Sequence, residues 1–151
     1  GYLYDSSIFP VRHDYYGLSE WSRWPGVAVR QEDGPWRPGT QACDGFTSLL
    51  EVQITSMEIA GVRVPIAGGG YLRLFPYAFT RFGLNRINRV EGRPFVFYLH
   101  PWELDPGQPK IKGACFRSRM RHYLNQVKTE GRLRRILQDF KFGPIGEFLK
   151  V

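Results

Sequence analysis

The apolar positions of the chain follow two different spacings, and each spacing predicts a different kind of element. Within residues 48–55 they alternate with polar positions from Leu50 onward, which is typical of a half-buried strand, and residues 57–66 continue as a second extended segment. Between residues 76 and 90 the spacing becomes helical, and asparagines and arginines supply the polar side. The apolar stripe consists of Tyr77, Ala78, Phe79, Phe82, Ile87 and Val90. The pattern therefore predicts strands followed by an amphipathic helix.

Five consecutive apolar residues, Phe95 to Leu99, predict a strand that is buried on both faces. The run stops at His100, because Pro101 has no N–H for a sheet ladder and favours an extended conformation in the residue before it. We therefore expect His100 at the end of a central strand, at the rim where parallel α/β folds collect ligands and catalytic groups. A histidine that only ends a strand fits the spacing equally well.

Turn residues and tryptophans predict the structure of two segments in the first third of the chain, a short strand and a long loop. Residues 1–10 predict a short strand with Asp5-Ser6-Ser7 at its end, because the Asp-Ser-Ser sequence favours a local turn. Residues 19–46, rich in Gly and Pro, predict a long loop. The loop carries Trp21, Trp24 and Trp36, whose faces could stack on sugar rings, although at least one is expected only to pack against the core.

The C-terminal part of the chain predicts a further helix. Apolar side chains recur at helical spacing from residue 129, and Gly143-Pro144 follows the pattern. The core-seeking positions are Leu133, Ile136, Leu137 and Phe140. The order of helix, short loop and buried strand that precedes this segment is the one that a βα barrel repeats, so the expected fold class is α/β.

Length, hydrophobic content and cysteine spacing limit the classes of protein to which the chain can belong. A chain of 151 residues with 42% hydrophobic residues is long enough for one domain with its own core. No apolar run approaches the roughly 20 residues that a transmembrane helix needs. Cys43 and Cys115 lack metal-ligand or CxxC spacing, which fits two free thiols and a reducing compartment.

The net charge of +7 is concentrated near the C-terminus. Residues 110–141 contain ten Lys or Arg against two acids, a balance of +8, so the rest of the chain stands at −1. Such a block can bind nucleic acid, anionic lipid or anionic polymer, or it can be a solvated helix face. No RNP, KH or zinc-knuckle signature is present, so no nucleic acid is expected. For Arg132, Arg134 and Arg135 a solvated face is the preferred interpretation.

Three long motifs carry a resemblance to a known family: GGGYLRLFPY, FYLHPWELDPGQP and RHYLN with TEGRLRRILQDFKFGPI. Together they resemble the C-terminal half of polysaccharide deacetylases, in the subfamily found with exosortase and exopolysaccharide loci. The resemblance implies that residues 1–112 form the C-terminal part of a distorted (β/α) barrel, whose N-terminal part lies outside this chain. Residues 113–151 would then be a basic, partly helical C-terminal extension packed on it.

The resemblance also implies a reaction, the hydrolysis of N-acetyl groups on an N-acetylated polysaccharide. That reaction needs a divalent metal, an activated water, a base and an acid. In the family an Asp and two His bind the metal, usually Zn²⁺. The three histidines, His13, His100 and His122, show no such ligand spacing, and no Asp-Asp pair is present. The metal ligands are therefore expected upstream of Gly1, and this chain alone is expected to lack activity and a tight Zn²⁺ site.

By the same resemblance His100 is the general acid for the departing amine. Asp5 is the expected carboxylate that supports His100 or the substrate, although Tyr-Asp-Ser-Ser differs from the Asp-x-Asp-Trp of other branches. Glu103 and Asp105 are alternatives for that role, and His122 is expected to be structural. The expected substrate-binding residues are His13, Asp14, Tyr71, Arg73, Trp102 and Glu103.

Two other functions remain open from the sequence. The first is a non-catalytic glycan-binding module on the same scaffold. The second is a basic domain that binds an anionic polymer through residues 110–141. The sequence immediately before Gly1 distinguishes the enzyme from the module, because an Asp-Asp pair and an HxxxH there favour the enzyme.

Overall fold

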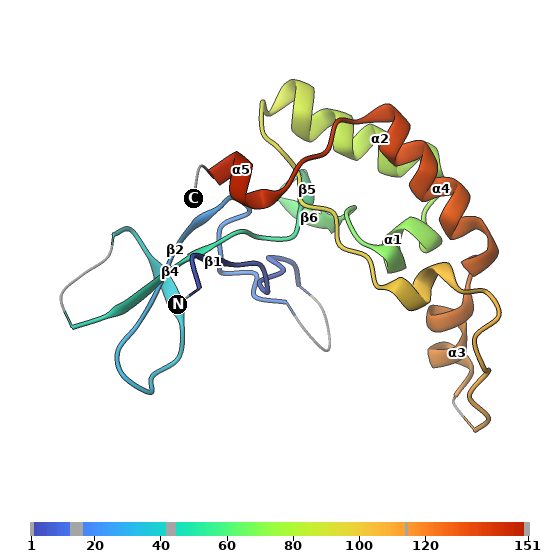
Figure 1. The fold of residues 1–151 in the computed structure, drawn as a ribbon, viewed down its shortest axis with the longest axis horizontal. Coiled ribbons are helices and arrows are strands. Elements are labelled where there is room, and N and C mark those ends of the chain that lie inside the picture. The colour runs from blue at the N-terminus through green and yellow to red at the C-terminus, as the bar shows by residue number, and fades with distance from the viewer. Residues whose placement is uncertain (1, 13–16, 42–44, 114, 150–151) are drawn as a thin grey trace. The chain divides into compact units, whose positions relative to one another are not determined.

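The fold was obtained as a computed structural model, which describes residues 2–12, 17–41, 45–113 and 115–149 (Figure 1). The chain is mixed α/β, as the sequence predicts, and it divides into two compact units. Unit 1 takes residues 1–65 with 94–97, and unit 2 takes residues 66–93 with 98–151. The described residues form two small sheets and a set of helices, and they do not close into a barrel.

The larger sheet of unit 1 has four strands in the order β1-β4-β2-β3. Their bounds are β1 Tyr4–Asp5, β4 Thr47–Glu51, β2 Gly26–Arg30 and β3 Arg37–Gly39. β1 runs parallel to β4, and the other pairs are antiparallel. The short strand at Asp5 and a strand within residues 48–55 are therefore confirmed.

The predicted long loop over residues 19–46 is wrong, because it contains the β2–β3 hairpin. Val27 and Val29 alternate along β2 with Ala28, which is only 4% exposed, and β-branched residues favour a pleated surface. The turn between the strands is closed by the Gly34 N–H, which donates to the Gln31 carbonyl at 2.9 Å. The Gly and Pro residues that suggested a loop thus mark the ends of a hairpin.

The tryptophans of this region behave differently from one another. Trp21 is 4% exposed and packs in the core, as expected for at least one of them. Trp36 is 37% exposed, and the guanidinium of Arg30 lies 4.9 Å from its ring centroid. One tryptophan therefore stabilises the fold, while another remains at the surface of unit 1.

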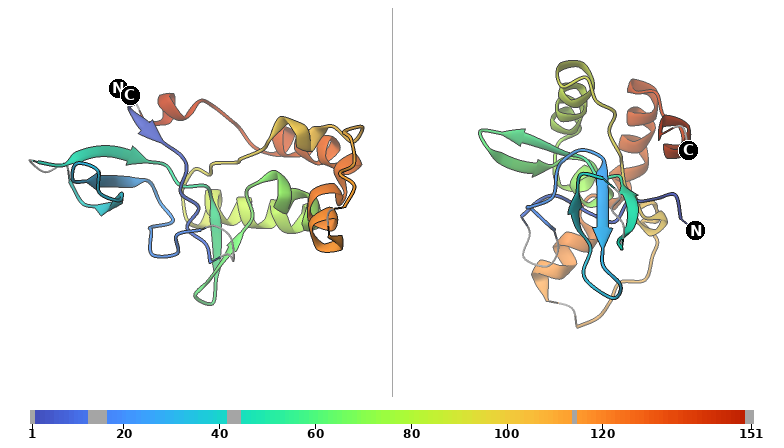
Figure 2. Two further views of the ribbon diagram at one scale, coloured as in Figure 1. Left: turned by 90° about the horizontal axis from the view of Figure 1, so that it is seen from below. Right: turned by 90° about the vertical axis from the view of Figure 1, so that its left-hand side faces the viewer.

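The second sheet of unit 1 is a hairpin of β5, Ser56–Ile59, and β6, Val62–Pro65 (Figure 2). Ala60 and Gly61 both adopt positive φ in its turn, at 50° and 77°. Arg63 on β6 donates from Nη1 to the carbonyls of Pro10, Ser19 and Trp21, at 3.1, 2.9 and 2.7 Å. The Arg63 side chain thus holds the backbone at Pro10 and again at Ser19 and Trp21.

Unit 2 is helical, and its core is formed by apolar side chains that are 0% exposed. Its helices are α1 Gly69–Leu74, α2 Tyr77–Asn85 with a π-helical turn Arg86–Val90, a 3₁₀ turn Pro101–Leu104, α3 Phe116–Tyr123, α4 Gln126–Asp139 and α5 Ile145–Leu149. The core includes Ile66, Leu72, Leu84, Ile87 and Ile136. Within the described ranges, none of these helices has the length and apolarity required to traverse a bilayer.

The helices over residues 77–90 and 129–140 are confirmed, but their buried faces differ from the predicted ones. Phe82 and Leu137 are 57% and 54% exposed, whereas Leu84 is fully buried. On α2 the buried positions are Tyr77, Thr80, Gly83 and Leu84. Gly83 lets Ile66 approach closely, because an added Cβ would lie 2.8 Å from its Cδ1. The inner face of α2 thus includes the small residue Gly83 and excludes the large apolar Phe82.

The expected central strand Phe95–Leu99 is wrong. Residues 94–100 are extended but belong to no strand, and Phe95 to Phe97 are only half-buried. Their backbone groups find single partners: the Val96 N–H donates to Thr55 Oγ1 at 2.8 Å, and the Tyr98 carbonyl accepts from the Gly69 N–H at 2.9 Å. An apolar run specifies extended backbone but does not specify a neighbouring strand. His100 consequently lies after an extended segment and before a 3₁₀ turn, not at a sheet rim.

Candidate functional site

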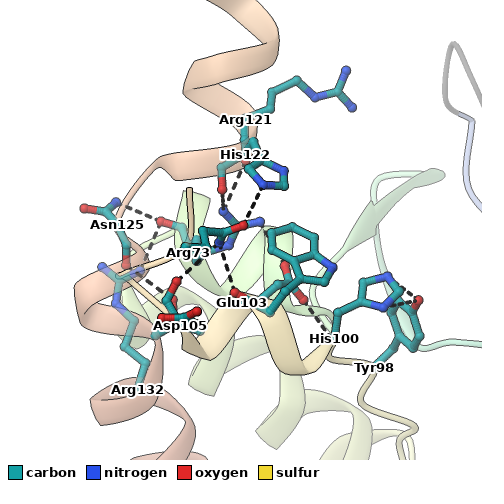
Figure 3. A network of polar contacts seen from close by, with 12 residues as sticks. Arg73, Tyr98, His100, Glu103, Asp105, Arg121, His122, Asn125 and Arg132 are labelled. Atoms are coloured by element: carbon teal, nitrogen blue, oxygen red, sulfur yellow. Dashed lines mark hydrogen bonds and ion pairs between the residues drawn. The ribbon is translucent and has the colours of Figure 1, made fainter. Parts of the chain in front are cut away.

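A buried ion pair stands at the centre of unit 2. Arg73 on α1 and Glu103 in the 3₁₀ turn are each 3% exposed, and Arg73 Nη2 lies 2.9 Å from Glu103 Oε1 (Figure 3). A buried charge is tolerated when it is paired and hydrogen-bonded. The pair joins the segment around His100 to the first helix of the unit.

The second oxygen of Glu103 fixes the backbone of His100. Glu103 Oε2 accepts the His100 N–H at 3.0 Å, and the Glu103 N–H donates to the His100 carbonyl at 3.0 Å. Gly69 makes room for this carboxylate, because an added Cβ would lie 2.0 Å from Oε2. The glycine run 68–70 therefore has a structural use, namely the close approach of a carboxylate to the start of α1.

The same arginine also binds the end of α3. Arg73 Nη1 donates to the carbonyls of Arg121 and His122, two acceptors at a helix C-terminus, where cationic side chains are favourable. The Asn125 side chain donates in turn to the Arg73 carbonyl at 2.8 Å. Figure 3 shows these contacts converging on Arg73. One side chain thus holds α1, α3 and the His100 segment together.

Aromatic rings form a row along this framework. His100 stacks on Trp102 with ring centroids 5.7 Å apart, and Trp102 stacks on His122 at 4.4 Å. Tyr98 meets His100 edge-on at 4.6 Å, so these two residues share a side, as alternation predicts. His122 Nε2 lies 3.1 Å from Gln108 Oε1, which fixes the inner end of the row.

The outer end of the row is exposed. Tyr98 is 44% exposed, His100 is exposed, and the Tyr98 hydroxyl contacts His100 Nε2. A hydroxyl can donate to a neutral imidazole or accept from an imidazolium, so it serves either protonation state. An imidazole in this setting can bind or release a proton toward a molecule at the surface.

The other predicted site residues differ in how accessible they are to a substrate. Arg73 and Glu103 are buried in their pair, so a substrate would meet them only if the pair opened. Asp105 closes a turn, because its Oδ1 accepts the Gly107 N–H at 2.9 Å. Tyr71 is half-buried and stacks on Phe75 with centroids 6.3 Å apart. His13 and Asp14 lie outside the described residues.

Asp5 belongs to unit 1, where its neighbour is a glutamate that the sequence did not single out. Asp5 pairs in register with Glu51 on β4, so the two carboxyl groups lie near one another. Glu51 is 2% exposed, and its Oε1 accepts the N–H groups of Ser7 and Ile8 at 3.1 and 2.8 Å. Burial raises the pKa of the Glu51 carboxyl, and the charge of Asp5 adds to this effect, while the amide hydrogen bonds oppose it.

This raised pKa predicts a pH-dependent contribution to stability. Because folded Glu51 holds its proton more tightly than the unfolded chain does, its contribution is complete below the ordinary glutamate pKa and is lost as pH rises through the raised value. Glu51→Gln, which can still accept the two amide hydrogen bonds, should therefore gain stability relative to the wild type as pH rises. Urea unfolding of both proteins from pH 4 to 8 measures this, and parallel curves would contradict it.

The basic face of α4 is not uniform. Arg132 Nη1 donates to the carbonyls of Leu72, Arg73 and Phe75 at the end of α1, so the solvated interpretation is wrong for it. Arg134 pairs with Glu130 at 2.7 Å, with both side chains exposed, as a solvated residue would. Arg135 lies 4.0 Å from the ring centroid of Tyr77.

Tyr77 joins α2 to α4. Its hydroxyl donates to Asp139 at 2.6 Å, and Asp139 also pairs with Arg81 at 2.8 Å. Burial, followed by the hydrogen bond to Asp139, raises the pKa of Tyr77 to about 12. The hydroxyl therefore stays protonated and can remain a donor throughout the physiological pH range.

Arg132 and Arg134 should accordingly respond differently to truncation. Arg132→Ala leaves three carbonyls without this donor and should cost about 1–3 kcal/mol of unfolding free energy. Arg134→Ala removes only an exposed i,i+4 pair and should change it by about 0.5 kcal/mol or less. Urea unfolding measures both, and equal losses would mean that the Arg132 contacts do not stabilise the fold.

No three His, Cys, Asp or Glu side chains gather as a metal-ligand set in the ranges that the structure describes. The residues described here therefore do not fit a resident metal. The expectation that the ligands lie upstream of Gly1 stays a prediction, as does the proximity of Asp5 and His100.

Comparison with known proteins identifies one family that the chain matches. Residues 6–150 match the model of a domain of unknown function (DUF3473). Neither the curated proteins nor the solved structures gave a match to the chain.

Proposed function

The chain belongs to the DUF3473 family, and from its motifs and the geometry around His100 we propose that it is part of a metal-dependent polysaccharide deacetylase. The full-length enzyme would hydrolyse N-acetyl groups from amino sugars of an exopolysaccharide. Residues 1–112 would complete a distorted (β/α) barrel, with residues 113–151 as its C-terminal extension. This chain would supply the general acid and part of the surface that contacts the sugar.

The observation that carries the proposal is an exposed imidazole on a fixed backbone. The His100 N–H is bound to Glu103, and Glu103 is held by Arg73 inside the core of unit 2. Catalytic groups need such support, because their geometry must be preorganised for the reaction. A histidine that only ended an extended segment would not need a buried ion pair behind it.

The chemistry assigned to His100 is one proton transfer. Water adds to the acetyl carbonyl, and the C–N bond of the resulting tetrahedral species breaks to give acetate and an amine. The amine nitrogen leaves readily only if it is protonated, and the His100 imidazolium donates that proton as the bond breaks. The metal would polarise the acetyl carbonyl and would be held by residues outside those described, so none of these residues is assigned a role as ligand.

The aromatic neighbours of His100 supply a surface for the sugar. Tyr98 is 44% exposed, and aromatic faces pack well against the apolar face of a pyranose ring. Trp102, on which both His100 and His122 stack, is partly exposed and would contact the sugar with its edge. Arg73 and Glu103 would act behind this surface as positioning residues. His13, Asp14 and Tyr71 remain proposed substrate contacts on the strength of the family resemblance.

A non-catalytic glycan-binding module is the second candidate. The exposed aromatic end of the row favours it, because rings alone can bind a sugar without any reaction. The two candidates differ in what His100 does: a module would use it for contact, and an enzyme would use it for proton transfer.

Acetate release from an N-acetylated glucosamine polymer tests the proposal. The full-length protein supplied with Zn²⁺ should release acetate, and free amino groups should appear on the polymer in equal amount. Binding of the polymer with no acetate released, at any metal concentration, would instead support the glycan-binding module.

A further inference from the structure

A second surface of unit 2 combines apolar and cationic side chains that the proposed reaction does not use. We propose that residues 110–113 and 115–121 form a docking surface for an anionic membrane, which would hold the protein at a phospholipid surface. We call this segment the basic ridge. It comprises the end of the loop that follows the 3₁₀ turn and most of helix α3.

The charge of the basic ridge is of one sign. It contains five Lys or Arg, and no Asp or Glu occurs between Asp105 and Glu130. Arg117 and Arg119 are exposed and form no ion pair within the described part of the chain. Exposed cations such as Arg117 and Arg119 are attracted to the negative potential of anionic lipid.

Apolar side chains stand among these cations. Phe116 is 78% exposed, Ile111 63% and Met120 44%, and no residue of α3 is buried. Phe116 and Met120 are four residues apart, so they share a face of the helix. A basic helix with an aromatic residue on its apolar face is the pattern of an interfacial helix.

The basic ridge is held in place from its other side. Gln108 binds His122, Arg73 binds the end of α3, and the Tyr123 hydroxyl accepts the Ile111 N–H at 2.9 Å. His122 stacks on Trp102, so the inner side of α3 is occupied. Phe116 and Met120 therefore stay exposed on a fixed scaffold, as insertion into a lipid interface requires.

This combination favours lipid over a soluble anionic polymer. A polysaccharide or nucleic acid would satisfy the cations and could stack a ring on Phe116, but it offers no apolar layer for the aliphatic side chains of Ile111 and Met120. A bilayer interface satisfies both, because it offers anionic headgroups above an apolar layer. The occupant that fits the basic ridge is thus an anionic phospholipid surface.

Vesicle sedimentation of the full-length protein tests the proposal. The protein should bind vesicles of phosphatidylcholine that contain phosphatidylglycerol, and should bind vesicles of phosphatidylcholine alone at least about tenfold more weakly. The double change Arg117→Glu and Arg119→Glu should weaken binding to the anionic vesicles by about tenfold or more. The double change Arg37→Glu and Arg89→Glu, at two exposed arginines outside the basic ridge, alters the net charge by the same amount and should bind like the wild type.

Substitutions of the apolar side chain of Phe116 distinguish binding to lipid from binding to a soluble polymer. Phe116→Ser should weaken vesicle binding, whereas Val127→Ser, at a residue that is 80% exposed on α4, should not. Phe116→Trp should restore binding, and its fluorescence should shift to the blue with anionic vesicles. No vesicle binding by the full-length protein would overturn the proposal. Vesicle binding that is unchanged by Phe116→Ser would also overturn it. So would a Phe116→Trp variant whose fluorescence shifts only with a soluble polyanion.

Discussion

Replacing His100 by alanine in the full-length protein should lower kcat by roughly 10²–10⁴, the usual contribution of a positioned general acid. The departing amine would then have to leave without the proton that the imidazolium supplies. The zinc content should not change, because His100 is not expected to be a ligand. Acetate release together with metal analysis of the purified variant measures both quantities.

Two outcomes would contradict this role of His100. Loss of zinc in the variant would mean that His100 is a metal ligand. Turnover at the wild-type rate would mean that His100 has no catalytic role and only ends the extended segment. A general loss of structure is checked separately: His100 is exposed, so the midpoint of urea unfolding should stay close to that of the wild type.

The largest loss of stability is expected at the buried ion pair. Arg73→Met keeps much of the side-chain volume but leaves Glu103 charged and buried, and removes the donor to the carbonyls of Arg121 and His122. Breaking one side of such a pair costs about 3–5 kcal/mol. Combining it with Glu103→Leu should recover part of the loss, because no uncompensated charge then remains. A loss below about 1 kcal/mol for Arg73→Met would show that the pair does not hold unit 2 together.

Two neighbouring glycines offer a matched test of the same site. Gly69→Ala places a Cβ against the Glu103 carboxylate and should cost about 1–3 kcal/mol, the usual effect of overpacking. At Gly70 the nearest atom is Arg73 Nη2 at 4.0 Å, so Gly70→Ala should be neutral or should stabilise α1 by about 0.5–1 kcal/mol. Equal effects of the two changes would mean that the carboxylate is not where the structure places it.

Periodicity predicted the helices well and their buried faces less well. The helical spacing from residue 129 is confirmed by α4, because spacing over three turns is a strong signal. The side that faces inward depends on what packs there, and at Gly83 the neighbour is Ile66, which comes from another part of the chain. The strand expected at Phe95–Leu99 is wrong for a similar reason, since strand pairing is a property of two segments.

Two important carboxylates illustrate what single-sequence reasoning can find. Glu51 occupies a polar position of the alternating strand, so the pattern places it on the exposed face, whereas the structure leaves it only 2% exposed. Glu103 was predicted to contact substrate from the family resemblance, and nothing in its neighbours indicated that Arg73, thirty residues earlier, would neutralise it. The pair becomes visible only when α1 and the 3₁₀ turn are brought together.

The most direct test of the central claim compares two leaving groups. For the full-length enzyme, His100→Ala should reduce kcat/KM by roughly 10²–10⁴ with an N-acetyl amino sugar, whose amine needs a proton to leave. With 4-nitrophenyl acetate, whose phenolate leaves without one, the same variant should lose about tenfold or less. If both substrates lose the same factor, His100 does not act as the general acid.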